Sequence, residues 1–185
     1  RAAALEQLNE AAARAPAGCR GVIFTPWLNG ERTPVEDSAL RGGFWNMSLD
    51  TTRDEMVRAV FEGVALNSRW LLEAVERFTG RRHDPIAVAG GGAQSELWCR
   101  IHADVLGRTM RRVADPIQVN ARGAGLLALA ALGHVAFTDL SARVPIADSY
   151  APDPAVAGTY DAAYATFRRV HRANRRLYAR LHPTA

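Results

Sequence analysis

The sequence of 185 residues contains no lysine, because all 23 positions in its Lys and Arg total are arginine. Chemistry that depends on a lysine side chain is therefore excluded. This covers the lysine of a Walker-type phosphate loop, the ATP-binding lysine of protein kinases and Schiff-base catalysis. A net charge of +4 is also too small to indicate a nucleic-acid partner by itself.

Cysteines and long apolar runs are scarce as well. Cys19 and Cys99 are far apart and lack metal-ligand spacing, which predicts two reduced thiols in a cytoplasmic protein and no metal site. No run approaches the roughly 20 apolar residues of a membrane span, and no signal peptide precedes the first expected helix. With 48% hydrophobic residues, residues 1–185 are expected to form a single domain without a membrane partner.

The first half of the chain predicts two helices with two strands between them. Residues 2–14 predict an alanine-rich helix, and its abrupt start at Arg1 suggests that the chain is cut from a longer one. Strands are expected at 22–28 and 44–49, on either side of a polar loop. In that loop, Glu31 and Arg32 are expected to pair with each other or to meet a ligand.

A long amphipathic helix follows the second strand. Thr52 and Glu55 have the Thr-x-x-Glu form of a capping box, and the helix is expected to end at Gly80. Glu62 and Asn67 lie off its apolar stripe. They are expected on a solvated face or facing a cleft.

Residues 85–120 are the most informative stretch. A short apolar strand at 86–89 is followed by Gly90, Gly91 and Gly92, by a helix that ends at Gly107, and by a strand at 109–113. Glycines at a strand–helix junction let backbone N–H groups and a flat ligand approach the helix N-terminus, where the dipole favours an anion. This pattern predicts a nucleotide-binding turn.

The last third predicts two further helices. Gly123 and Gly125 open an apolar helix that ends at Gly133, and each glycine costs the helix roughly 1 kcal/mol. Close packing of this backbone against the triple-glycine turn is expected to offset that cost. Residues 134–153 are expected to be irregular because of their prolines. A helix over 155–181 has an arginine-rich second half that is expected to be a solvated face.

Two nucleotide chemistries are open at this point. A Walker loop is excluded by the absence of lysine. A Rossmann site would use the Gly90-x-Gly92-x-x-Ser95 pattern with Asp115 after the next strand, in a NAD(P)-dependent oxidoreductase with a fully parallel sheet. Against this, the third small residue is serine and Asp115 comes about five residues late.

The other possibility is a resemblance carried by four motifs in order. They are NGERTP at 29–34, RGGFWNMSLDTTRDEMVRAVFEGVA at 41–65, AGGGAQSELWCRIHADVLG at 89–107 and ARGAGLLALAALG at 121–133. Together they resemble the C-terminal domain of FGGY-family carbohydrate kinases, and the first loop is most similar to that of xylulose kinases. The resemblance implies an α/β, actin-like ATPase and ribonuclease-H-like lobe, in which a mixed sheet is flanked by helices.

The resemblance also implies a function. The whole enzyme would use ATP and Mg²⁺ to phosphorylate a sugar hydroxyl, of D-xylulose or a related ketose, and an N-terminal kinase lobe would be a partner of this chain. In the family, the catalytic aspartate and the phosphate-binding turns precede this region. No catalytic residue is therefore expected within 1–185, and the chain alone is expected to be inactive. A non-catalytic nucleotide-binding module and a homodimer stay open.

Carried over by position, the resemblance assigns nucleotide-binding residues. Gly91, Gly92 and Ala93 would lie against the adenine and ribose, with Gly90 opening the turn. Glu96 would contact the nucleoside, and Ser95 would either start a helix that the ligand caps or be an ordinary N-cap.

The sequence departs from the family pattern at two positions. Asn46 stands where glycine is usual, and Arg100 stands where glutamine is common. Asp104, in the same helix, is expected to make a structural hydrogen bond.

Overall fold

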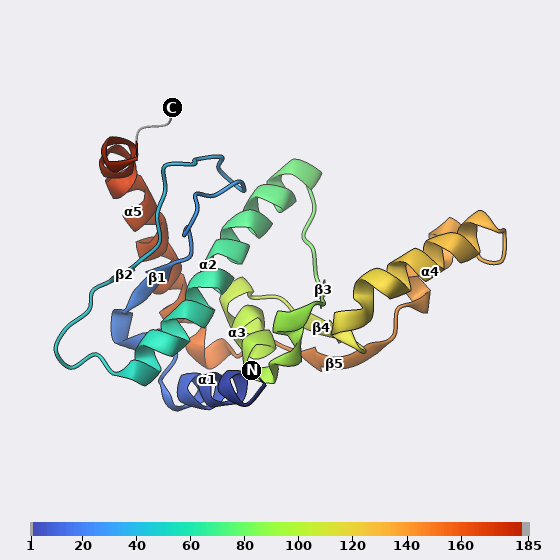
Figure 1. Cartoon of the computed structure of the whole chain (residues 1–185), viewed down its shortest axis with the longest axis horizontal. Coiled ribbons are helices and arrows are strands. Elements are labelled where there is room, and N and C mark those ends of the chain that lie inside the picture. Colours follow the sequence, from blue (N-terminus) through green and yellow to red (C-terminus); the bar gives the residue numbers. More distant parts are fainter. Residues whose placement is uncertain (1, 183–185) are drawn as a thin grey trace.

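The computed structural model describes residues 2–182. Most of the helices pack together in one body, and one helix projects from it with the segment that follows (Figure 1). The helices are α1 (Ala2–Arg14), α2 (Arg53–Thr79), α3 (Glu96–Leu106), α4 (Val119–Ala131) and α5 (Ala157–Leu181). The strands are β1 (Ile23–Thr25), β2 (Gly43–Trp45), β3 (Ile86–Val88), β4 (Met110–Val113) and β5 (Ile146–Tyr150).

Helix α2 is the central element, with α1 below it and α5 beside it (Figure 1). The expected capping box is present, because the Thr52 side chain accepts from the Glu55 N–H while the Glu55 carboxylate accepts from the Thr52 N–H. Gly80 ends the helix in a left-handed conformation, with φ 67°. Gly63 lets α2 approach β1 closely, since a Cβ there would collide with the Phe24 carbonyl.

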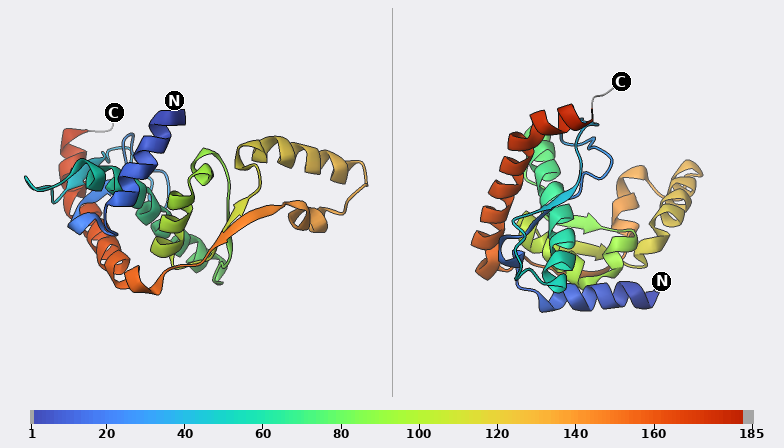
Figure 2. Two further views of the ribbon diagram at one scale, coloured as in Figure 1. Left: turned by 90° about the horizontal axis from the view of Figure 1, so that it is seen from below. Right: turned by 60° about the vertical axis from the view of Figure 1, so that its left-hand side comes forward.

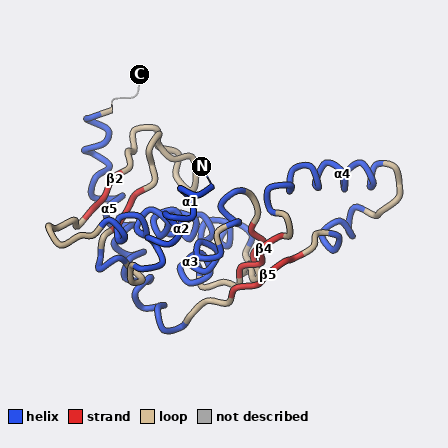
Figure 3. Tube along the Cα trace, turned by 60° about the horizontal axis from the view of Figure 1, so that its bottom comes forward, coloured by secondary structure: helices blue, strands red, loops and turns tan. Residues whose placement is uncertain are grey.

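The strands form two small sheets. β1 and β2 pair antiparallel, whereas β3 pairs parallel with β4 and β4 pairs antiparallel with β5. The three-stranded sheet lies between α3 and α4 (Figure 3). Its mixed direction agrees with the implied lobe and contradicts the fully parallel sheet of the Rossmann alternative.

Two strand predictions and one prediction of irregular structure need correction. The strand expected at 22–28 stops at Thr25, just before Pro26, which has no N–H for a ladder. The strand expected at 44–49 stops at Trp45, because Asn46 has a φ of 63°. Residues 134–153 are not irregular throughout, because they contain a 3-10 helix over Phe137–Arg143 (η4) and strand β5. Strand β5 pairs with β4, where Arg112 lies opposite Asp148, 36 residues later in the chain.

The expected packing of Gly123 and Gly125 against the glycine turn is wrong. A Cβ at either position would meet nothing within 4 Å, and no residue of α4 is buried. The turn contacts the 3-10 helix Pro116–Gln118 (η3) instead, through a 2.8 Å bond from the Gly90 N–H to the Pro116 carbonyl. Helix α4 starts beyond that contact and, with η4, forms an arm that leaves the body (Figure 2).

The expectation of a solvated or cleft-facing Glu62 is also wrong, because Glu62 is only 3% exposed. Its Oε1 accepts from Arg58 Nε at 2.7 Å and from the Tyr160 hydroxyl at 2.9 Å. It also accepts from the Gly18 N–H at 3.1 Å, and its Oε2 lies 3.3 Å from Cys19 Sγ. Burial, together with the charge of Glu62, raises the pKa of the Cys19 thiol.

Asn67 and Glu31 also have structural roles. Glu31 Oε1 accepts from the Arg32 backbone N–H at 2.8 Å, so the loop is held by Glu31 without a Glu31–Arg32 side-chain pair. Its Oε2 accepts from Asn67 Nδ2 at 2.7 Å, and Asn67 Oδ1 accepts from Trp27 Nε1 at 3.1 Å. Asn67 therefore joins α2 to the loop, and neither the expected ion pair nor a solvated Asn67 is observed.

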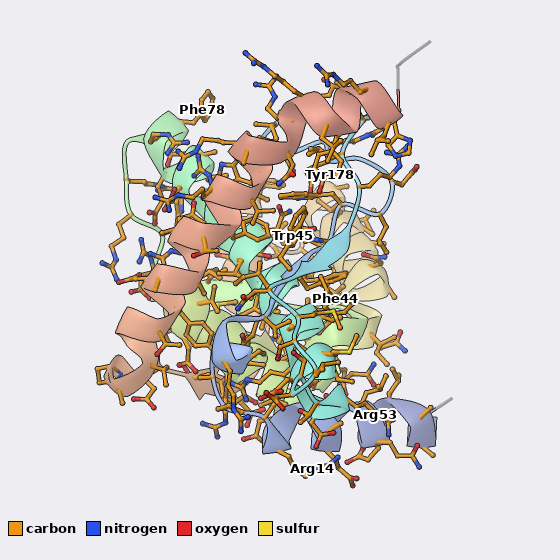
Figure 4. The ribbon with its side chains drawn as sticks, turned by 90° about the vertical axis from the view of Figure 1, so that its left-hand side faces the viewer. Arg14, Phe44, Trp45, Arg53, Phe78 and Tyr178 are labelled. Atoms are coloured by element: carbon orange, nitrogen blue, oxygen red, sulfur yellow. The ribbon has the colours of Figure 1, made fainter. Side chains whose placement is uncertain are left out.

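Helix α5 covers the aromatic part of the core. The rings of Trp27 and Phe167 lie 5.1 Å apart, and those of Trp70 and His171 lie 4.8 Å apart. Tyr178 faces the β1–β2 side of the molecule, whereas Phe78 projects from the far end of α2 and is 92% exposed (Figure 4). The basic half of α5 is not solvated throughout, because the Arg168 guanidinium lies 4.5 Å from the centre of the Trp70 ring.

His171 makes the stability of this core pH-dependent. Burial, and secondarily the charge of Arg175, lower the pKa of His171 below its ordinary 6.5. The unfolded chain then takes up the proton first, so stability that is complete above pH 6.5 is lost as the pH falls toward the folded-state pKa. We expect the midpoint of urea unfolding to drop between about pH 7.5 and about pH 5.5.

His171→Phe should flatten that dependence, because a phenyl ring suits the aromatic surroundings and does not titrate. A residual slope is expected from His102, whose pKa burial also lowers. The control is His134→Phe, the same substitution at an exposed position after α4, which should keep the slope that comes from His171. An unaltered slope in His171→Phe would contradict this assignment.

No helix within residues 2–182 is long and apolar enough to cross a membrane. Both cysteines are free thiols, as expected, and both are buried.

Candidate nucleotide-binding site

The glycine turn lies between β3 and α3, where the sequence predicted it. The α-helix does not begin directly after the glycines, because Gly91–Gln94 first form one 3-10 turn (η2). Ser95 then caps α3, and its Oγ accepts from the Trp98 N–H at 3.1 Å. Of the two roles left open for Ser95, the structure shows the N-cap.

The three glycines meet different requirements. Gly90 has φ 89° and ψ −174°, a conformation that L side chains avoid. Gly92 lies against Trp98, so a Cβ there would be only 2.8 Å from Trp98 Cε3. Gly91 has neither constraint, and nothing lies within 4 Å of the position of its Cβ. The open face of the turn is therefore at Gly91.

A cavity of about 760 Å³ opens in front of this face. Its volume is within the range usual for small-molecule sites, about 300–1,000 Å³. Helix α1 forms one wall, and α2, the turn, α3 and η3 form the rest. The lining residues are Leu5, Glu6, Leu8, Asn9, Phe61, Gly91, Gly92, Gln94, Ser95, Trp98 and Ile117.

An aromatic pair, Phe61 and Trp98, lines the cavity. The rings of Phe61 and Trp98 stack at 5.4 Å with an angle of 27° between their planes. Trp98 Nε1 donates to the Phe61 carbonyl at 3.2 Å, which joins α3 to α2. A flat apolar ring could therefore lie on aliphatic and aromatic surface, next to the backbone of Gly91.

Few polar groups line this apolar space. The Ser95 hydroxyl donates to Asn9 Oδ1 at 2.7 Å, across the junction of α3 and α1. Gln94 Nε2 donates to the Gly91 carbonyl at 3.2 Å. The site thus combines a largely apolar slot with a few fixed polar groups, the usual composition of a cofactor site.

The structure brings together only part of the predicted residue set. Gly91, Gly92 and Ser95 line the cavity. Gly90 shapes the turn from behind, and Ala93 is 1% exposed beneath it. Glu96 lies on the exposed side of α3 and pairs with Arg100 at 2.6 Å.

The sequence did not indicate that α1 lines the cavity, through Leu5, Leu8 and Asn9. It also did not indicate the lining residues Phe61 of α2 and Ile117 of η3. The spacing of Leu5 and Leu8 indicates an apolar helix face but not what it contacts. The role expected for Asp104 is confirmed, since its Oδ1 accepts from the Asp153 N–H at 2.8 Å.

A second hollow, of about 950 Å³, is larger but has a different character. It lies between residues 36–39 and the end of α5, and its lining includes Glu36, Asp37, Arg172, Arg175 and Arg176. These charges of both signs face one another across it, with Arg175 and Asp37 at 4.0 Å. It contains neither a glycine turn nor a helix N-terminus, so the first cavity is the candidate site.

Fold and site together describe an α/β lobe with a mixed sheet and a ligand-sized cavity at a glycine turn. Solved structures of sugar kinases with the actin-like ATPase fold superpose on it. Residues 1–132 match the model of the C-terminal domain of the FGGY family of carbohydrate kinases. The chain belongs to this family.

Its relatives are longer proteins. The xylulose kinase of Staphylococcus epidermidis is 28% identical over 178 residues, which are 95% of this chain and 36% of that protein. The chain therefore spans about a third of the length of the curated relatives that it matches.

Two solved structures illustrate the fold. The xylulose kinase of Rhodospirillum rubrum superposes with a TM-score of 0.79 and 33% identity, over 95% of this chain and 35% of that one. The gluconate kinase of Lactobacillus acidophilus gives 0.83 and 26% identity, over 96% and 36%.

Proposed function

We propose that this chain is the ATP-binding C-terminal lobe of a kinase that phosphorylates a sugar hydroxyl. The observation that carries the proposal is the open face of Gly91 above the 760 Å³ cavity at the start of α3. A nucleobase is flat and apolar on its faces, so it suits the slot beside the turn. Membership in a family of carbohydrate kinases supports ATP as the nucleotide.

In this proposal the chain binds and orients the adenosine end of ATP. Gly91 and Gly92 let the nucleoside approach the backbone, and Ser95 fixes the start of α3. Gly90 and Ala93 give the turn its shape. Glu96 would need to leave its pair with Arg100 to contact the nucleoside, so it is the weakest member of the proposed set.

The chemical step would need groups from outside this chain. No cluster of three or more His, Cys, Asp or Glu side chains that could hold a metal occurs in the described part of the chain. We assign no metal chemistry and no catalytic base to residues 2–182. In phosphoryl transfer the metal and a positioning carboxylate act at the phosphates, which would lie beyond the adenosine pocket.

The missing groups would come from an N-terminal lobe. Support comes from the greater length of the relatives and from the exposed apolar surface of the α4 arm. Leu127, Leu132 and Phe137 are 56%, 72% and 74% exposed, although a helix that is apolar all round is normally covered. A second lobe packed here would enclose the substrate cleft and exclude water on closure.

The sugar and the cellular setting are further parts of the proposal. The xylulose kinase relatives favour D-xylulose or a related ketose. A cytoplasmic location agrees with the reduced thiols. A homodimer stays a proposal without a contact assigned to it.

Calorimetric titration of the chain with ADP, and with NADP⁺ in parallel, tests the proposal. We expect ADP to bind and NADP⁺ to bind more weakly, because the cavity offers one base-sized slot beside the turn. Tighter binding of NADP⁺, or turnover of ATP and xylulose by this chain alone, would refute it.

A further inference from the structure

Helix α1 forms a wall of the cavity that the glycine-turn pattern does not include. Its position is fixed at its C-terminal end, where Arg14 Nε donates to Asp54 Oδ2 at 2.7 Å. The buried Arg58 side chain also donates to the Ala15 carbonyl at 3.1 Å. These two bonds hold the C-terminal end of α1 against α2.

Asn9 is the polar residue of this wall that is anchored to the glycine turn. Ser95 Oγ accepts from the Trp98 N–H, and its hydroxyl hydrogen points to Asn9 Oδ1 at 2.7 Å. This orients the carboxamide. Within residues 2–182, the side-chain hydrogen bond found for Asn9 is at Oδ1, none is found at Nδ2, and Asn9 lines the cavity.

The other polar side chains of the cavity are less suited to reading a base. Gln94 is exposed and donates to the Gly91 carbonyl. Glu6 is exposed on the outer part of α1. Asn9 is half-buried, and its anchor Ser95 belongs to the same turn that would hold the nucleoside.

We propose that Asn9 selects adenine over guanine at this site, a role that rests on the proposed nucleotide-binding function. A carboxamide pairs with adenine because its N–H₂ donates to a ring nitrogen while its oxygen accepts from the exocyclic amine. Guanine presents a carbonyl oxygen where adenine has that amine, so the Asn9 oxygen would face another acceptor. The Ser95 bond uses one lone pair of Oδ1, and the other remains for the amine.

The test measures ADP and GDP affinities by calorimetry for the chain and three variants. The unmodified chain should bind ADP at least about tenfold more tightly than GDP. Asn9→Leu should bring the two affinities within about threefold by weakening ADP. Asn9→Asp should move the preference toward GDP, because a carboxylate only accepts and guanine offers two neighbouring donors.

Gln7→Leu is the matched control, since it removes a carboxamide from an exposed position on the same helix. It should keep the ratio of the unmodified chain. An ADP:GDP ratio unchanged in Asn9→Asp, with ADP still bound, overturns the role of Asn9 alone. Failure of the unmodified chain to bind ADP overturns the proposed function and this inference together.

Discussion

Glu62→Ala is expected to lower the free energy of unfolding by about 3–5 kcal/mol, the range observed when one partner of a buried ion pair is removed. The side chains of Arg58 and Glu62 are only 11% and 4% exposed. Without Glu62, the Arg58 charge would lie buried with the Tyr160 hydroxyl and two backbone carbonyls as its remaining partners. Urea unfolding followed by circular dichroism measures the change.

Glu96→Ala is the matched control, because Glu96 and Arg100 are also a Glu–Arg pair four residues apart on one helix. Their bond is as short, at 2.6 Å, but the two side chains are 60% and 61% exposed. Such a pair contributes about 0.5 kcal/mol or less, since water already solvates both charges. Equal losses in the two variants would show that burial does not set the cost at Glu62.

The network around Glu62 shows which part of the fold the sequence could not indicate. The two ends of α2 could be predicted because their signals are local: a capping box at Thr52 and a left-handed glycine at Gly80. The burial of Glu62 depends on Gly18 and Tyr160, which are 44 and 98 residues away in sequence. Helical periodicity describes one helix face at a time, so it does not report what covers that face.

Strand β5 was missed for a similar reason. Its five residues, Ile146–Tyr150, include alanine, aspartate and serine, which have little strand propensity. Pairing with β4 forms it, aided by the ion pair between Arg112 and Asp148. Pro145 does not disrupt the sheet, because its carbonyl accepts from the Ala114 N–H at 2.9 Å.

The candidate site also has one part that the sequence could indicate and one part that it could not. The glycine turn and its N-cap lie within six consecutive residues, so a local pattern contains them. The opposite wall comes from α1, about 80 residues earlier in the chain, and its contact with the turn is the Ser95–Asn9 bond, 86 residues apart. One of the family motifs contains the glycine turn, but no motif covers α1. The cavity could therefore be identified only from the structure.

Gly91→Val is expected to weaken ADP binding by at least about tenfold, or about 1.4 kcal/mol, without changing the thermal unfolding temperature. A Cβ at Gly91 would meet no protein atom within 4 Å, and Gly91 does not have a left-handed backbone, so the fold should tolerate a side chain there. The same side chain would occupy the space in front of the turn that the nucleoside needs. Calorimetry with ADP and a thermal melt of each variant measure the two effects separately.

Two further variants make this prediction specific. Gly92→Ala should lower the unfolding temperature, because its Cβ would displace the Trp98 ring that stacks on Phe61. A loss of ADP binding in Gly92→Ala would come both from the blocked space and from the destabilised fold. Gly91 is therefore the better position for the test. Gly158→Val, on α5 with nothing within 4 Å and outside the cavity lining, should keep ADP binding. If Gly91→Val binds ADP as tightly as the unmodified chain, the nucleoside does not lie against the turn.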